Sequence, residues 1–92
     1  MPYINNNRRS YIESVSHLSD FISRLNTLDP ALSEGDLNYL ISSIVQVCLG
    51  SDTSYQNINK VVGVLECAKL ELYRRIAVPY EDKKIKENGD VY

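Results

Sequence analysis

The stretch INKVVGVLECAKLELYRRI, residues 58–76, decides the fold class because its apolar residues recur at helical spacing. Apolar residues three, four and seven positions apart line one face of an α-helix. We therefore expect an amphipathic helix over about residues 55–77. Its apolar stripe consists of Ile58, Val61, Val62, Leu65, Ala68, Leu72 and Ile76.

The two ends of this helix also have sequence signals. Ser54 or Thr53 in the preceding loop is a suitable N-cap. Pro79 is expected to close the helix, because proline lacks a backbone N–H and crowds the preceding turn. Gly63, in the middle, is unfavourable for a helix by about 1 kcal/mol against alanine, which we interpret as close approach of another helix.

A second helix is expected over residues 34–49. Ser33 and Asp36 form a variant of the capping box, and Gly50 is a natural C-cap. A buried strand is the alternative for ISSIVQV (41–47), where β-branched residues are dense, but the helical period continues through both flanks. The apolar side consists of Leu37, Leu40, Ile41, Ile44, Val45 and Cys48.

The first helix is expected over residues 8–28 and ends before Pro30, because the residue before a proline is pushed out of helical geometry. Its stripe consists of Tyr11, Val15, Leu18, Ile22 and Leu25. Short connections between three amphipathic helices predict an all-α fold, a small antiparallel three-helix bundle that forms a single domain over residues 1–92.

The C-terminal residues 78–92 contain too little apolar material for another independent helix, and ENGD (87–90) is a turn signal. Spaced anchors predict an ordered tail that packs on the bundle or on a neighbouring subunit; they are Tyr80, Ile85, Val91 and Tyr92. A chain of 92 residues buries only about 60% of its surface. Such domains often gain stability by association, so we expect a homo-oligomer.

The composition excludes several classes of function. The net charge is −2, with 12 acidic and 10 basic residues, so there is no basic field for duplex nucleic acid. The N-terminus has no apolar run that suits a signal peptide or membrane anchor, so we expect a cytoplasmic protein of a bacterium or of something that lives in one. Cys48 and Cys67 lack zinc or redox spacing and are expected to be small core residues rather than a disulfide.

Nothing in the sequence points to catalysis. His17 is the only histidine, and no carboxylate and nucleophile accompany it in sequence. No glycine-rich phosphate loop is present. The acids of the tail do not match a calcium loop and alternate with lysines, as a solvated surface does; they are Glu81, Asp82, Glu87 and Asp90. We expect no enzyme, no metal and no cofactor.

Arg74 and Arg75 lie in the last turn of the helix expected over 55–77. Cations stabilise a helix C-terminus, and that alone accounts for both arginines. Arginine also presents a planar fork of N–H donors that suits phosphate and stacks on a base. Tyr73 and Tyr80 supply aromatic faces in the same stretch, so a binding site for an aromatic anion is the functional alternative.

Asn38 and Tyr39, on the second expected helix, would complete a pocket for a base and a phosphate. Tyrosine and arginine are equally the preferred residues of protein interfaces, and composition alone favours an interface over a nucleotide pocket. A polar stripe beside the apolar face of the third helix suits an interface, a ligand groove or, most commonly, a solvated edge; it consists of Asn59, Glu66, Lys69 and Tyr73.

Three motifs, GDLNYLI (35–41), GVLECAKLELYRR (63–75) and PYEDKKIKENGDVY (79–92), resemble a family of small proteins of unknown function from tailed bacteriophages and prophages. The resemblance includes the opening MPYI (1–4), whereas residues 5–32 look variable. It implies a phage origin and brings no characterised catalytic residues.

A phage origin favours proteins that counter host immunity. One strategy is the sponge, an oligomer that captures a nucleotide second messenger of cyclic-oligonucleotide (CBASS-type) or Thoeris defence without cleaving it. Another is an inhibitor or adaptor that docks on a host or phage enzyme, and a structural accessory is a third. The sponge is favoured because positive charge and aromatic faces gather in a few positions, with Lys83 and Lys84 beside the arginines and tyrosines. So small a chain would hold its ligand between symmetric copies.

Overall fold

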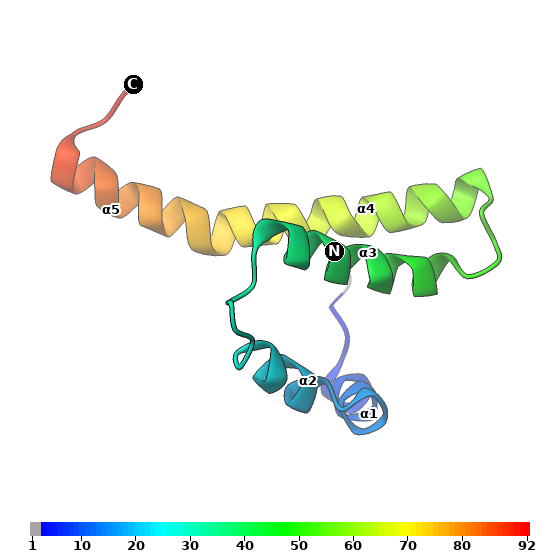
Figure 1. Cartoon of the computed structure of the whole chain (residues 1–92). Helices are drawn as coiled ribbons and strands as arrows, with labels where there is room; N and C mark the ends of the chain where they lie inside the picture. The colour runs from blue at the N-terminus through cyan, green and yellow to red at the C-terminus, as the bar shows by residue number, and fades with distance from the viewer. Residues whose placement is uncertain (1–2) are drawn as a thin grey trace. The chain divides into compact units, whose positions relative to one another are not determined.

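The computed structural model describes residues 3–92, and all regular structure in that range is helical (Figure 1). No strand occurs among the described residues. The predicted all-α fold is therefore confirmed, and α3 (Glu34–Leu49) replaces the strand considered for residues 41–47. The chain divides into two units, Met1–Gln46 and Val47–Tyr92, and each is described by itself.

The first unit begins with two short helices where we expected one helix over residues 8–28. α1 (Asn6–Ser16) and α2 (Leu18–Leu25) are separated at His17, whose φ of 55° and ψ of 41° lie in the left-handed region. A left-handed residue cannot continue a right-handed helix, so the chain turns there. The Met and Pro that open the MPYI motif lie outside the described residues.

Glu13 stabilises this break. His17 is the N-cap of α2 but makes no capping hydrogen bond with its side chain. The Ser19 N–H instead donates to both carboxylate oxygens of Glu13, at 2.9 and 3.2 Å. Hydrogen bonds from the Ser19 side chain and backbone lower the pKa of Glu13. An acid from the end of α1 therefore caps the start of α2.

The signals at the ends of α3 and at the start of the next helix are confirmed. The Ser33 N–H donates to Asp36 Oδ2 at 2.9 Å, and the Asp36 N–H donates to Ser33 Oγ at 3.1 Å, which is a reciprocal capping box. Gly50, directly after α3, has φ of 56°. Ser54 accepts a hydrogen bond from the Asn57 N–H at 3.3 Å and caps α4.

The second unit is dominated by one uninterrupted helical segment. It consists of α4 (Tyr55–Leu72), a π-helical turn η1 (Tyr73–Ala77) and α5 (Val78–Asn88), which follow one another directly in Figure 1. At 1.5 Å per residue the segment is about 50 Å long. We expected the helix to end at Pro79, but it continues to Asn88.

The π turn explains how the helix passes through Pro79. Proline removes one backbone N–H and crowds the carbonyl four residues earlier. In η1 the Val78 N–H donates to the Tyr73 carbonyl, five residues earlier, which widens the turn just before the proline. Pro79 then occupies the first turn of α5, where its missing N–H costs least. α5 ends at Gly89, with φ of 87°, as the Asn-Gly turn signal predicted.

The apolar stripe of α4 is exposed to solvent. Leu72 is 59% exposed and Ile76 is 64% exposed. No side chain within residues 3–92 is fully buried. Gly63 has no atom of the described chain within 4 Å of the position that a Cβ would take, so the close helix approach that we expected there is absent from this range.

Two further sequence interpretations can be compared with the structure. Cys48 is exposed and Cys67 is partly exposed, and both are free thiols, so neither is the core residue that we expected. No helix within the described residues is long and apolar enough to cross a membrane.

Candidate anion-binding site

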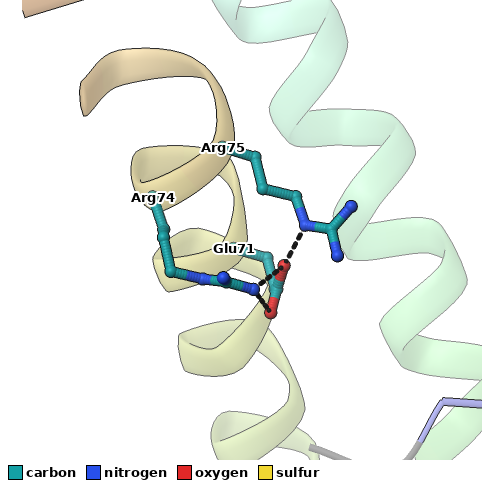
Figure 2. Close-up of polar contacts among 3 residues, drawn as sticks. All are labelled: Glu71, Arg74 and Arg75. Carbon is teal, nitrogen blue, oxygen red and sulfur yellow. Dashed lines mark hydrogen bonds and ion pairs between the residues drawn. The ribbon is translucent and has the colours of Figure 1, made fainter. Parts of the chain in front are cut away.

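The clearest polar cluster of the second unit consists of Glu71, Arg74 and Arg75 (Figure 2). Arg74 Nη2 donates to both oxygens of the Glu71 carboxylate, at 2.9 and 3.1 Å. Arg75 Nε donates to Oε2 of the same carboxylate at 2.8 Å. Two guanidinium groups therefore meet at a single oxyanion.

Helix geometry produces this convergence. Arg74 and Arg75 follow Glu71 by three and four positions, the two spacings that place side chains on the same helix face. The arginine side chains are 65% and 64% exposed, whereas the Glu71 side chain is 25% exposed. The carboxylate is thus the most covered member, and the two cations face solvent around it.

Both arginines lie in the π turn η1. π turns are rare, occur mostly as single turns within α-helices and are frequent at functional sites. Tyr73 and Ile76 flank the arginines in the same turn, and both side chains are more than half exposed. Charged and apolar groups are therefore presented together at one point of a long helix.

A second, smaller cluster lies on α5. Lys84 Nζ is 5.5 Å from the centre of the Tyr80 ring, a cation–π contact. Lys84 also forms an ion pair with Glu87 at 3.1 Å. Tyr80 remains exposed, so its other ring face is available for stacking. Tyr80 follows Arg75 by five positions, which is about 7.5 Å along a helix axis.

A family model for a domain of unknown function, DUF6899, matches residues 1–91. The match covers nearly the whole chain. The chain belongs to the DUF6899 family. No curated protein matches the chain, and no solved structure matches it either.

The structure of this DUF6899 chain brings together some of the residues that the sequence analysis selected. Arg74 and Arg75 meet at one carboxylate, and Tyr80 meets Lys84, as described above. Lys69 forms an ion pair with Glu66 at 3.3 Å, within the predicted polar stripe of α4. That pair is well exposed, as is typical of a solvated helix edge.

Other selected residues are not joined to these clusters. Lys83 is exposed on α5. Asn38 and Tyr39 lie on α3 within the first unit, where both are exposed and the Tyr39 carbonyl accepts a hydrogen bond from Ser43 Oγ at 2.8 Å. Their contribution to the arginine site stays a prediction.

Glu71 is the residue that the sequence analysis missed. Its signal was available, because an acid three and four positions before two arginines forms ion pairs on a helix. A shallow hollow of about 300 Å³ at the end of α5 was missed as well. Its lining includes Lys84, Ile85, Val91 and Tyr92, but Val91 is 89% exposed and Tyr92 is fully exposed, so these two predicted anchors are not packed on α5.

The described residues offer no metal-binding cluster: within 3–92 no group of three or more His, Cys, Asp or Glu side chains is placed to hold an ion. What the site offers chemically is a pair of guanidinium groups, exposed aromatic rings and a single competing carboxylate. Such groups recognise an anion with an aromatic part.

Proposed function

We propose that this DUF6899 protein is a phage-encoded protein that captures a nucleotide-derived immune messenger, of the CBASS or Thoeris type, without cleaving it. The convergence of Arg74 and Arg75 on one oxyanion carries the proposal. It supports phosphate binding because guanidinium groups placed in this way offer several N–H donors to the same acceptor. The phage origin rests on the motif resemblance described above, and the site of action in this proposal is the cytoplasm of the infected bacterium.

The aromatic part of the messenger would stack on tyrosine. Tyr80 is exposed and already carries one cation, Lys84, near its ring. Stacking of a base on an aromatic side chain contributes about 1–3 kcal/mol. Tyr73, Lys69 and Lys83 would add a second ring and further positive charge. Asn38 and Tyr39 of α3 remain part of the proposed pocket.

The proposal includes a homo-oligomer, because large apolar side chains of the long helix in the second unit are exposed to solvent. α4 has apolar side chains on more than one side: Leu72 and Ile76 belong to the main stripe, whereas Val64 and Leu70, both more than half exposed, lie outside it. A helix that is apolar on several sides is normally buried by several neighbours. We propose a second copy of this chain as one of these neighbours.

Helix lengths support a second copy. α3 has 16 residues and is about 24 Å long. The segment from α4 to α5 is about 50 Å long. α3 is therefore less than half as long as this segment. The antiparallel three-helix bundle predicted from the sequence would therefore form the protomer, and the remaining length would pair with the other copy.

A protein-binding role is the second candidate, and one observation favours it. Tyr73, Ile76 and Tyr80 are all more than half exposed and lie three and seven positions apart. Helices that dock into a groove of a partner use anchors at these spacings. In this role the protein would inhibit or link a host or phage enzyme and would not respond to nucleotides.

Thermal unfolding with a panel of cyclic oligonucleotides and ADP-ribose-type nucleotides separates the two candidates. A ligand at 100 times its Kd stabilises the folded protein by about 2.7 kcal/mol. The sponge proposal predicts a shift in Tm for one nucleotide class. Arg74→Ala should abolish that shift.

Arg24→Ala is the matched control for this experiment. Arg24 forms an exposed ion pair with Asp20 at 3.0 Å, four positions away on α2, in the other unit. This variant makes the same substitution and breaks the same kind of ion pair, so its Tm shift with nucleotide should be the wild-type one. A nucleotide shift that survives Arg74→Ala would contradict the site, and a protein partner recovered without any nucleotide response would favour the second candidate.

A further inference from the structure

The site already contains an anion, the carboxylate of Glu71. Its two oxygens accept all three hydrogen bonds printed in Figure 2, two from Arg74 and one from Arg75, at 2.8 to 3.1 Å. These distances are those of charge-assisted hydrogen bonds. The chain itself therefore demonstrates that both guanidinium groups reach one oxyanion at the same time.

The three described side chains of the cluster differ in number of charges. Two guanidinium groups carry two positive charges, since arginine stays protonated at all ordinary pH, and Glu71 supplies one negative charge. Among the described residues Arg75 contacts Glu71 through Nε, and its two Nη groups remain for another acceptor. The Nη groups of Arg75 are thus the donors that an incoming anion can engage first.

A phosphate group would compete well for this position. Exposed ion pairs within a helix contribute little to stability, because water screens them and the side chains lose freedom. A nucleotide with two or more phosphate groups carries more negative charge than one carboxylate and offers more acceptor oxygens. It can therefore engage both guanidinium groups and the remaining Nη donors together.

We infer that Glu71 is an intramolecular competitor at this site: it holds Arg74 and Arg75 in position when no ligand is bound, and a phosphate group of the ligand displaces it. This inference rests on the proposed function and assigns the phosphate subsite within it. Glu71 sets the affinity of the site, because an incoming phosphate group has to compete with its carboxylate for the two guanidinium groups. Glu71 is a positioning residue for the two arginines rather than part of the ligand contact.

Glu71→Gln tests the inference, because glutamine keeps the size of the side chain and removes its charge. The probe is inorganic phosphate, titrated into isotopically labelled protein while the Nε–Hε resonances of Arg74 and Arg75 are followed by NMR. Two exposed ion pairs are lost, so the affinity for phosphate should rise by a factor between about 2 and about 30. Circular dichroism of the same samples verifies that the helix content is unchanged.

Glu66→Gln is the matched control. Glu66 lies on the same helix and pairs with a single lysine, Lys69, at 3.3 Å. Its substitution by glutamine changes the net charge by the same amount as Glu71→Gln. It should leave phosphate affinity at the wild-type value. Glu71→Asp supplies a second variant that keeps the charge but shortens the side chain by one methylene, and its affinity should lie between those of the wild type and Glu71→Gln.

The outcomes separate this inference from the proposed function. If phosphate shifts both arginine resonances but Glu71→Gln binds no tighter than Glu66→Gln, the competitor role is wrong while the arginine site stands. If phosphate shifts neither arginine in the wild type or in Glu71→Gln, the subsite itself is wrong. If phosphate binds as expected but no nucleotide changes the Tm, the inference holds and the sponge proposal falls.

Discussion

The substitution Ile76→Ser tests whether a second copy covers the apolar stripe of α4. Ile76 is 64% exposed in the single chain. Burying a complete isoleucine side chain contributes about 1.5–3 kcal/mol, so covering its exposed part contributes about 1–2 kcal/mol per copy. In a twofold dimer the same residue is buried twice, because each copy presents the same surface. The substitution should therefore cost about 2–4 kcal/mol of dimerisation free energy, which weakens Kd roughly 30- to 700-fold.

Ile76→Ser should change the folding stability of the single chain much less than it changes the dimerisation free energy. The side chain is already mostly exposed there, and substitutions at such positions usually change stability by about 0.5 kcal/mol or less. Sedimentation velocity over a concentration series measures Kd, and circular dichroism measures helix content in the same samples. A dimer that dissociates on dilution while both proteins keep their helices would locate the effect in the interface.

Val91→Ser is the control for Ile76→Ser. Val91 is 89% exposed and lies beyond the end of α5, outside the stripe. The Val91→Ser substitution also replaces a β-branched apolar residue by serine, and it should leave the Kd of the dimer within about twofold of the wild-type value. If Ile76→Ser also leaves Kd unchanged, or if the wild type is a stably folded monomer at every concentration, the stripe is not covered by a second copy and the reasoning is refuted.

Three further predictions concern the helices themselves. Gly63→Ala should raise the stability of the single chain by about 1 kcal/mol in thermal unfolding, since a Cβ there meets nothing within 4 Å; a weaker oligomer in this variant would instead mean that Gly63 touches another copy. Ser54→Ala should cost about 1 kcal/mol, because it removes the cap that accepts the Asn57 N–H, and an unchanged Tm would contradict that cap. Glu13 has a pKa lowered from 4.5 by hydrogen bonds from Ser19, so the stability that it gives to the α1–α2 break is present above pH 4.5 and is lost as the pH falls through the lowered value. The Ser19 amide resonance should move in that acidic range, and an amide that is insensitive to pH down to full protonation of Glu13 would exclude the hydrogen bond.

Local sequence signals predicted α3, α4 and most of the caps, whereas α5 lies in residues that we expected to form a non-helical tail. The period of 3.6 residues identified the helices, and the reciprocal pair of Ser33 and Asp36 and the caps at Gly50 and Ser54 were found at the expected positions. These features depend only on residues within a few positions of one another. Their physical causes are therefore contained in short stretches of sequence.

The breaks in the regular pattern were harder to predict. His17 adopts a left-handed conformation that is uncommon for a residue other than glycine, and a carboxylate six positions before Ser19 stabilises it. Pro79 normally ends a helix, but a π turn lets the helix pass. In both places a hydrogen bond accompanies a conformation that single-residue preferences disfavour: the Ser19 N–H bonds to Glu13 at the break, and the Val78 N–H bonds to the Tyr73 carbonyl before the proline.

The candidate site was predicted in part. The arginine pair was predicted from its charge and planar donors, whereas its carboxylate partner Glu71 was not, although its spacing of three and four positions from the arginines favours ion pairs on a helix. Joining Asn38 and Tyr39 to the arginines requires the arrangement of helices that lie far apart in sequence. Apolar periodicity does not specify that arrangement, since it says which face of a helix is covered and not what covers it.

Mass spectrometry of the purified protein tests the central claim most directly. The protein would be produced in bacteria that carry an active nucleotide-signalling defence, and one preparation would be analysed in its native state while a second is denatured and filtered to release small molecules. We predict an intact nucleotide, stoichiometric with a multimer, in the wild-type and Arg24→Ala proteins and absent from Arg74→Ala. A wild-type protein without any nucleotide, from cells shown to be making the signal, would contradict the account.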